Sequence, residues 1–312
     1  MVCVPTKSGG IRITVNYQKL NKVTIIPRIA IPRVDEVLDT LGGSSVFSVF
    51  DLFSGFTQLT IHPDIIPLTA FCTPTGLYEW LRMPQGAAGA PVWFVSAMRL
   101  VTTGLDNVRM YLDDAIGSDD CPINHVSTLA TFFARLRLHK LKLSPDKSRI
   151  GAARVDFLGH LISEDGLRPD HDRVAALSRM PMPSDITELR SFLCGLSYYR
   201  KSPTDMARRI RPTVLLEKGA KFDFNPDMED IVRSLLAELT APPILVFPHW
   251  DAVTDKSRPF RFHCDASTAG FGTSLKQEQL DGSIRPIVYI SRATLTNEQN
   301  WTPLELEAGC IV

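Results

Sequence analysis

The chain lacks the features that mark membrane proteins and secreted proteins. None of its 312 residues belongs to a run approaching the ~18 to 20 apolar residues that a membrane-spanning helix needs. The amino end has no charged segment followed by an apolar one, as a signal peptide would. Cysteine is sparse as well: the six cysteines are scattered and form no Cys-x-x-Cys pair, which argues against a disulfide framework and a zinc knuckle. We expect an intracellular protein, neither secreted nor bound to a membrane, with reduced thiols.

Net charge is absent too, because 34 basic residues balance 34 acidic ones. The positive charge is nevertheless concentrated in one region. Residues 190–221 contain eight Lys or Arg against two acids, Asp205 and Glu217. A basic stretch is commonly a solvated face, and it also suits the neutralisation of nucleic-acid phosphates. Charge alone leaves both interpretations open.

The pattern of apolar residues predicts a mixed fold of helices and strands, with about two domains for this length. Residues 162–221 have a helical pattern, and strands return after Pro242-Pro243. The expected elements are a hairpin at 2–15, helices at 32–41, 90–103, 125–141 and 186–199, strands at 45–50, 260–265, 270–275 and 285–291, and a final helix opened by Thr302-Pro303.

The most informative feature is a pair of adjacent carboxylates, Asp113 and Asp114, inside the apolar stretch 108–116. An Asp-Asp pair on its own is usually a solvated turn. In apolar surroundings, however, an ionised carboxylate costs several kcal/mol unless a cation neutralises it. Magnesium suits this role because it prefers carboxylate and phosphate oxygens.

A third acid strengthens that interpretation. Asp51 ends the expected buried strand 45–50 and directly precedes a turn signal, Ser54-Gly55. If this strand lies beside the one that carries Asp113 and Asp114, the three acids meet at one edge of a sheet. A two-metal site that holds a triphosphate and stabilises an in-line displacement needs such an arrangement.

Further motifs follow in a recognisable order. Around the acids they are Phe50-Asp51-Leu52-Phe53-Ser54-Gly55-Phe56 and Tyr111-Leu112-Asp113-Asp114. The others are Thr69-Ala70-Phe71, Met83-Pro84-Gln85-Gly86 with Ala90-Pro91 and Phe94, Phe157-Leu158-Gly159-His160, Leu189-Arg190-Ser191-Phe192-Leu193 and Tyr198-Tyr199-Arg200. In order and spacing, and over nearly the whole chain, they resemble the reverse transcriptase of gypsy-type long-terminal-repeat retrotransposons.

The resemblance implies an α+β fold, in which a right-hand polymerase with fingers, palm and thumb precedes a truncated ribonuclease H-like α/β domain. Residues 1–161 would form the fingers and palm, with the amino-terminal fingers incomplete. Residues 162–221 would form the thumb and connection helices, and 222–312 the ribonuclease H-like domain, truncated at its carboxyl end. The basic stretch would then lie along the nucleic-acid backbone.

The implied activity is RNA-directed DNA synthesis, in which a nucleotide passes from a dNTP to a primer 3′-hydroxyl. The implied cofactors are two Mg²⁺ ions, with Mn²⁺ as a substitute. The implied partners are a primed RNA or DNA template, dNTP and other domains of a retrotransposon polyprotein, in a cytoplasmic particle or the nucleus.

Site residues are assigned by the same resemblance. Asp51, Asp113 and Asp114 would be the catalytic and metal-binding acids, with Asp51 and Asp113 as the main ligands and Asp114 as a neighbouring carboxylate. Phe56 would exclude a ribose 2′-hydroxyl, unless its ring only fills the core. The remaining assignments are Lys147 as general acid for pyrophosphate, Lys7, Arg12, Gln85, Gly86 and Tyr111 at the nucleotide, and Phe157, Leu158, Gly159 and His160 as the primer grip. Lys7 and Arg12 could equally be exposed hairpin charges.

In the carboxyl-terminal part, Asp265 at a strand end and Glu307 on the next helix match the first two acids of a ribonuclease H-like site. The other two acids would come from chain beyond Val312, so we expect no RNA hydrolysis from this chain alone. Incomplete fingers, and Thr6, Asn16 and Gln18 where the family has lysine, aspartate and arginine, favour an alternative. The chain would then be an inactive remnant that at most binds nucleic acid. An unrelated two-metal phosphotransferase is a distant third hypothesis.

Overall fold

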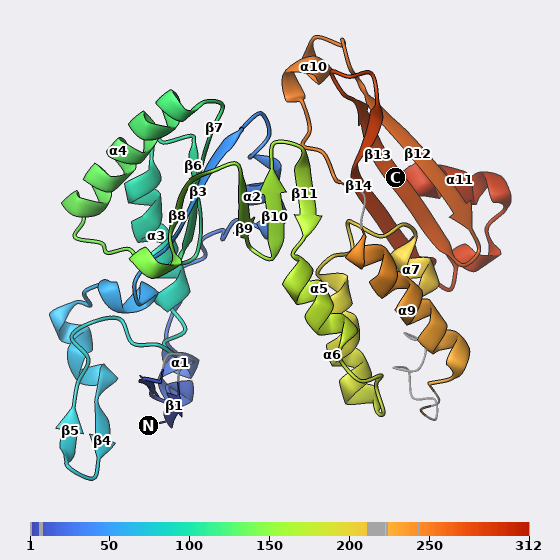
Figure 1. Cartoon of the computed structure of the whole chain (residues 1–312). Coiled ribbons are helices and arrows are strands. Elements are labelled where there is room, and N and C mark those ends of the chain that lie inside the picture. The colour runs from blue at the N-terminus through green and yellow to red at the C-terminus, as the bar shows by residue number, and fades with distance from the viewer. Residues whose placement is uncertain (1, 6–8, 211–221, 223, 242–243, 312) are drawn as a thin grey trace. The chain divides into compact units, whose positions relative to one another are not determined.

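The computed structural model describes residues 2–5, 9–210, 222, 224–241 and 244–311 (Figure 1). They form two compact units, residues 1–155 and 156–312, each with its own hydrophobic core. Among the described residues, no helix combines the length and apolar character that crossing a bilayer requires.

The centre of the first unit is a four-stranded antiparallel sheet in the order β6-β7-β3-β8. The strands are β3 (Val46–Asp51), β6 (Val108–Tyr111), β7 (Asp114–Asp119) and β8 (Arg149–Ala152). Two helices, α3 (Ala90–Thr102) and α4 (Pro122–Leu138), pack against the sheet and against each other (Figure 1). Both helices begin with a proline in the first turn, where its missing N–H costs nothing.

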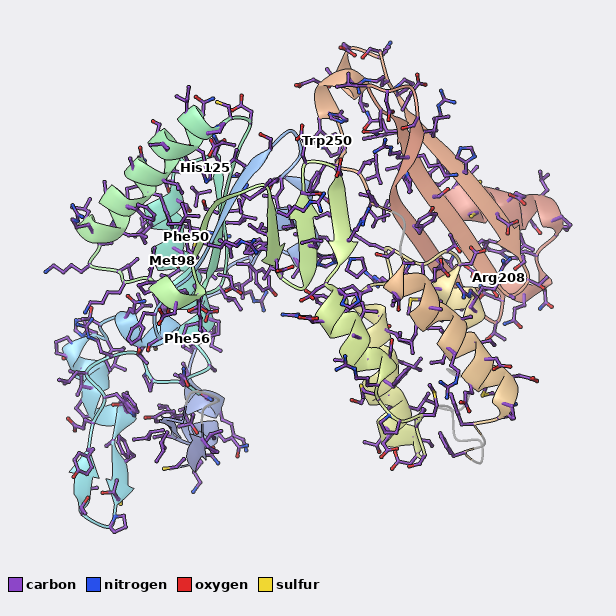
Figure 2. The ribbon with its side chains drawn as sticks, viewed as in Figure 1. Phe50, Phe56, Met98, His125, Arg208 and Trp250 are labelled. Carbon is purple, nitrogen blue, oxygen red and sulfur yellow. The ribbon has the colours of Figure 1, made fainter. Side chains whose placement is uncertain are left out.

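Large aromatic side chains fill the space between this sheet and its helices. Phe50 of β3 contacts Phe132 and Phe133 of α4, with ring centroids 5.7 and 5.4 Å apart. Phe94 and Met98 of α3 complete the same cluster, and both are buried. Figure 2 labels Phe50 and Met98 in this unit. The core therefore fixes β3, whose last residue is Asp51.

Smaller elements surround the sheet. They are β1 (Val2–Pro5), β2 (Ile11–Thr14), α1 (Gln18–Val23), α2 (Val34–Asp39), η1 (Gly55–Gln58), η2 (Pro63–Thr69), β4 (Phe71–Thr73), β5 (Gly76–Tyr78) and η3 (Pro145–Lys147). β1 pairs with β2 and β4 with β5 as separate antiparallel hairpins.

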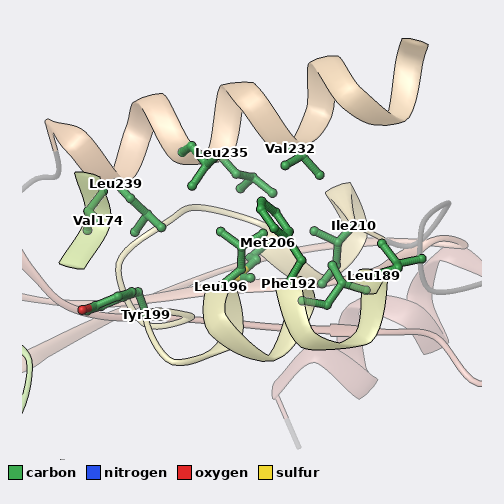
Figure 3. Close-up of a cluster of buried hydrophobic side chains, with 12 residues drawn as sticks. Val174, Leu189, Phe192, Leu196, Tyr199, Met206, Ile210, Val232, Leu235 and Leu239 are labelled. Carbon is green, nitrogen blue, oxygen red and sulfur yellow. The ribbon is translucent and has the colours of Figure 1, made fainter. Parts of the chain in front are cut away.

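The second unit contains a helical core that four helices share. These are α5 (His171–Ser178), α6 (Ile186–Ser197), α7 (Met206–Arg209) and α9 (Pro226–Thr240). On α9 the buried residues are Val232, Leu235, Leu236 and Leu239, a spacing that places them on one face. Figure 3 shows Val232, Leu235 and Leu239 opposite Phe192 and Leu196 of α6. The first helix of the expected ribonuclease H-like region thus packs against the expected thumb helices.

Two three-stranded antiparallel sheets complete this unit. One has the order β11-β10-β9, and the other β12-β13-β14. The strands are β9 (Arg154–Phe157), β10 (His160–Ser163), β11 (Gly166–Pro169), β12 (Phe260–Ser267), β13 (Gly270–Glu278) and β14 (Ile284–Ala293). The remaining elements are α10 (Trp250–Thr254), η5 (Glu298–Asn300) and α11 (Pro303–Ile311), which packs on β12.

Most of the elements expected from the sequence are present, with shifted ends. The helix expected at 125–141 begins and ends three residues earlier, at Pro122 and Leu138. The helical character expected from 162 onward is wrong for its first residues, because 160–163 and 166–169 pair as strands. Each strand has only four residues, too few for a period-2 pattern to stand out.

Candidate active site

The sheet register brings the three predicted acids to one edge. Asp51, the last residue of β3, lies directly opposite Asp114, the first residue of β7. Asp113 lies in the short turn between β6 and β7, and its carbonyl accepts a hydrogen bond from the Leu52 N–H at 2.9 Å. Two segments more than 60 residues apart in sequence therefore place these three acids at the same edge of the sheet. All three acids are partly buried.

The backbone around Asp113 is held in an unusual conformation. Leu112 has φ +55°, in the left-handed region that non-glycine residues rarely adopt. On the facing segment, Gly55 is buried with φ +35°, and a Cβ there would lie 3.4 Å from the Asp113 Cβ. Glycine at 55 therefore lets this turn approach Asp113 closely. Strain of this kind often accompanies functional sites.

Asp51 already has two partners at its carboxylate. The Ser144 hydroxyl donates to Oδ1 at 3.0 Å, and Lys147 Nζ donates to Oδ2 at 3.0 Å. The Ser144 N–H also donates to the Asp51 carbonyl at 2.8 Å. The structure thus brings Lys147, expected as a general acid, directly to a predicted metal ligand. Ser144 was not expected, because only the fold brings it next to Asp51.

The residues at this edge suit a metal ion, although they do not form a complete set of metal ligands in the structure. Among the described residues, no three His, Cys, Asp or Glu side chains converge as a metal cluster. The Lys147 side chain is 66% exposed, and an ion pair so exposed contributes only about 0 to 1 kcal/mol, so a divalent cation can replace it. Magnesium commonly takes one or two protein carboxylates and completes its shell with phosphates and water. Asp51 and Asp113 meet that requirement.

Phe56 lies in η1, immediately after the Gly55 turn. Its ring contacts the buried Phe94 edge to face, with centroids 5.4 Å apart and planes at 81°. The ring, labelled in Figure 2, is only partly buried, so it both packs on the core and retains exposed surface. Packing and substrate selection are compatible at this position.

The predicted nucleotide loop is held by an asparagine. Gly86 has φ +98°, and a Cβ there would lie 3.0 Å from the Val15 carbonyl, so the position needs glycine. The Asn21 amide donates to the Gly86 carbonyl and accepts from the Ala88 N–H, both at 2.9 Å. Gln85 is partly buried beside it. Asn21 carries no sequence signal, since its role depends on a loop 65 residues away.

The remaining predicted nucleotide residues differ in how far the structure describes them. Tyr111 ends β6 opposite Asp114, next to the acids. Arg12 lies on β2, but its side chain is outside the described part. Lys7 lies outside the described residues altogether. Asn16, one of the departures from the family, accepts a hydrogen bond from the Gln18 N–H at 3.0 Å, which stabilises the local turn.

The predicted primer grip is a tight hairpin between β9 and β10. Leu158 and Gly159 have φ +46° and +71°, as a two-residue hairpin turn of the primed type requires. Phe157 is buried, and His160 begins β10 with its Nδ1 2.9 Å from the Leu158 carbonyl. The four residues therefore form one rigid turn.

Two tyrosines that sequence reasoning left unassigned bind this turn. The Tyr198 hydroxyl donates to the Leu158 carbonyl at 2.6 Å, and the Tyr199 hydroxyl to the Gly159 carbonyl at 3.1 Å. Their rings also pack against His160, with centroids 5.7 and 5.6 Å away. Burial raises the pKa of Tyr199 to about 12, so its hydroxyl keeps the proton it donates.

The two predicted nuclease acids lie in the second unit, and Asp265 is already paired. Arg208, labelled in Figure 2, has Nη1 3.3 Å from the Asp265 carboxylate and Nη2 2.7 Å from that of Asp205. Glu307 is exposed on α11. Burial is the largest cause that raises the pKa of Cys264, followed by Cys310 and then by the charge of Glu307. Asp265 and Glu307 therefore lie on two elements that pack against each other, β12 and α11.

Comparisons with known proteins account for nearly the whole chain. The family model described as reverse transcriptase (RNA-dependent DNA polymerase) matches residues 4–162. A second model, an RNase H-like domain found in reverse transcriptase, matches residues 224–312.

The curated relatives are transposon polyproteins. The Pol polyprotein from transposon 297 of Drosophila melanogaster is 34% identical over 99% of this chain. That from transposon gypsy of the same species is 29% identical over 96%, and the Tf2-3 polyprotein of Schizosaccharomyces pombe is 26% identical over 99%. The chain spans only 29%, 30% and 23% of these three relatives.

Solved structures show the same fold at low identity. A foamy viral protease-reverse transcriptase in complex with double-stranded DNA aligns with 99% of this chain at a TM-score of 0.88 and 22% identity. One in complex with an RNA/DNA hybrid aligns with 99% at a TM-score of 0.83 and 22% identity. The chain covers 54% and 41% of those two chains.

Proposed function

Because this chain belongs to the reverse transcriptase (RNA-dependent DNA polymerase) family, we propose that it is the polymerase part of a retrotransposon Pol polyprotein. It would add deoxynucleotides to a primer 3′-hydroxyl on an RNA or DNA template. The observation that carries the proposal is the meeting of Asp51, Asp113 and Asp114 at one sheet edge. We further propose the division into 1–161, 162–221 and 222–312 as fingers and palm, thumb and connection, and ribonuclease H-like domain.

Divalent metal ions are the general cofactors of this family, and we propose two Mg²⁺ ions, with Mn²⁺ as a substitute. When bound, they would polarise the reacting phosphate and lower the pKa of the primer hydroxyl. Asp51 and Asp113 would hold them, with Asp114 as a neighbouring negative charge. Lys147, released from Asp51 by the metal, would carry a proton toward the leaving pyrophosphate.

The residues around the acids would orient the substrates. Phe56 would limit space at the sugar 2′ position. Gly86 would let the backbone of its loop approach the incoming nucleotide, since no Cβ intervenes. Primer contact would come from the 157–160 hairpin. Nucleic acid in the foamy viral structures supports a duplex as the partner of this chain.

Primer extension by the purified chain tests the proposal. We expect deoxynucleotide addition on a primed RNA template in the presence of Mg²⁺, its loss on chelation of the metal, and its recovery when Mg²⁺ or Mn²⁺ is restored. A folded protein that binds the primed template and extends nothing would instead support the alternative, an inactive remnant that only binds nucleic acid. Thr6, Asn16 and Gln18, which differ from the residues usual in the family, are the sequence features that support the inactive-remnant alternative.

A further inference from the structure

A buried chain of polar side chains lies in the same sheet as the three acids, away from the edge that they share. The Ser48 Oγ on β3 lies 2.6 Å from Nε2 of His125 on α4. Nδ1 of the same ring lies 2.6 Å from the Asp119 carboxylate at the end of β7. All three residues are at most 2% exposed. Figure 2 labels His125 on α4, beside the sheet.

Every group in this relay has a partner when the histidine is neutral. The Gly151 N–H donates to the Ser48 Oγ at 2.9 Å, and the Ser48 hydroxyl can donate onward to Nε2. The proton on Nδ1 then faces Asp119, whose other oxygen accepts from Asn107 and Thr128. A fully satisfied buried network is rigid, because breaking any one bond leaves a buried polar group unpaired.

The connectivity is that of a serine hydrolase triad, but the surroundings exclude that chemistry. Ser48 has no exposed surface, so no substrate can reach its Oγ. The oxygen also already accepts from Gly151. A nucleophile must face a cleft that a substrate enters. The relay therefore acts within the fold.

Its position in the sheet indicates what it holds. β3 and β8 pair at Phe47 with Ala152 and at Val49 with Arg149, so two residues of β8 lie opposite the single residue Ser48. This is a β-bulge, and bulges next to active sites commonly aim nearby side chains. The Ser48 hydroxyl binds the backbone N–H of Gly151, one of the two bulged residues.

The residues that contact Asp51, Ser144 and Lys147, precede the bulge in sequence by only a few positions. β8 begins at Arg149, two residues after Lys147, the last residue of η3. A register slip of one residue would move this segment by about 3.3 Å along β3, which would break the present 3.0 Å contact between Lys147 and Asp51.

We propose that the Ser48–His125–Asp119 relay is a positioning network that locks the β8 bulge and thereby places Ser144 and Lys147 at Asp51. Its predicted effect on the rate of nucleotide incorporation rests on the proposed polymerase function. The three residues touch neither substrate nor metal. They act through the strands: β3 ends at Asp51, β7 begins at Asp114, and β8 follows the segment that contains Ser144 and Lys147.

The test compares Ser48→Ala with Ser118→Ala, a matched loss of a buried serine hydroxyl on the neighbouring strand β7. Leu136→Ala, in the core at the far end of α4, controls for a general loss of stability. Backbone hydrogen exchange is measured over residues 144–152 in each folded protein. Single-turnover incorporation gives the maximal rate and the dNTP dissociation constant separately.

For Ser48→Ala we expect faster exchange over 144–152 and a fall of about 10- to 100-fold in the maximal rate, with dNTP affinity unchanged, because a small misplacement of reacting groups has this effect. Ser118→Ala should keep the wild-type exchange in this segment, and Leu136→Ala should raise exchange throughout the first unit rather than selectively over 144–152. Equal behaviour of Ser48→Ala and either control would overturn the positioning role. If the wild-type chain extends no primer, the polymerase proposal fails, and the exchange comparison still decides this one.

Discussion

At the scale of single residues, the structure shows how the negative charge of one predicted acid, Asp51, is balanced. The pattern around Asp113 and Asp114 predicted a bound cation. The structure shows that a lysine from 96 residues away can neutralise Asp51 in the absence of metal. This part of the site could not be predicted, since nothing local links Lys147 to β3. The acids could be predicted, because strand-end carboxylates in apolar sequence are unusual.

Lys147→Ala tests the proton-transfer role. We expect the maximal single-turnover rate to fall by about 10²- to 10⁴-fold, the usual contribution of a general acid. Stability should change little because the side chain is 66% exposed. Lys142→Ala, an exposed lysine nearby, is the control. A rate equal to that of the control would show that Lys147 only pairs with Asp51.

Phe56→Ala tests sugar selection. Removal of the ring should raise ribonucleotide incorporation relative to deoxynucleotide by at least about tenfold, equivalent to ~1.4 kcal/mol of discrimination. Competition assays with matched nucleotides measure that ratio. Phe53→Ala removes an exposed ring three residues earlier and should leave it unchanged. Unaltered discrimination in Phe56→Ala would mean that the ring serves only to pack on Phe94.

At the scale of elements, strands and helices with long apolar patterns could be predicted, and short paired segments could not. The sequence indicated only that the strand ending at Asp51 could lie beside the segment that carries Asp113 and Asp114. The structure shows that this segment is a hairpin, β6–β7, and that β7 pairs with β3. The hairpin at 160–169 was missed because each strand has four residues and depends on its partners. Likewise, Tyr198 and Tyr199 gave no sign that they bind the turn at 158–159, 40 residues away.

Gly159→Ala tests how tightly Tyr198 and Tyr199 pack against the turn at 158–159. A Cβ at this position would lie 2.7 Å from Arg173 and 3.2 Å from Tyr198, with the backbone at φ +71°. The left-handed conformation alone costs about 1 to 2 kcal/mol for alanine. Gly282→Ala, at φ +77° with nothing within 4 Å, should show only that cost. We expect Gly159→Ala to lose more free energy of unfolding in denaturant titrations. Equal losses would show that the contacts at Gly159 do not matter.

At the scale of the whole molecule, each unit has a large core of its own among the described residues, and a smaller apolar cluster of Phe271, Leu306 and Cys310 lies in the second unit. Ordered motifs over nearly the whole sequence allowed the family to be predicted, and the family model confirms it. The sharing of one core by α6 and α9 could not be predicted, because both helices show only that one face is buried. Which faces meet is decided by packing rather than by local pattern.

Leu235→Ala tests the separation of the cores. Leu235 is fully buried on α9, and its truncation should cost about 2 to 5 kcal/mol in the second unit. Hydrogen exchange should then accelerate in α6 and α9 while β3 and β7 keep their protection. Phe132→Ala, in the core of the first unit, should show the reverse pattern. Simultaneous loss of protection in both cores would contradict this account.

The central claim is that the carboxylates at this sheet edge carry out nucleotide transfer. The most direct measurement is primer extension by Asp113→Asn beside the unaltered chain and Asp146→Asn, the same change at an exposed aspartate of η3. We predict extension by the unaltered chain and by Asp146→Asn. Asp113→Asn should bind the primed template normally and extend nothing, because it loses a metal-binding charge. Extension by Asp113→Asn at the unaltered rate would contradict the claim.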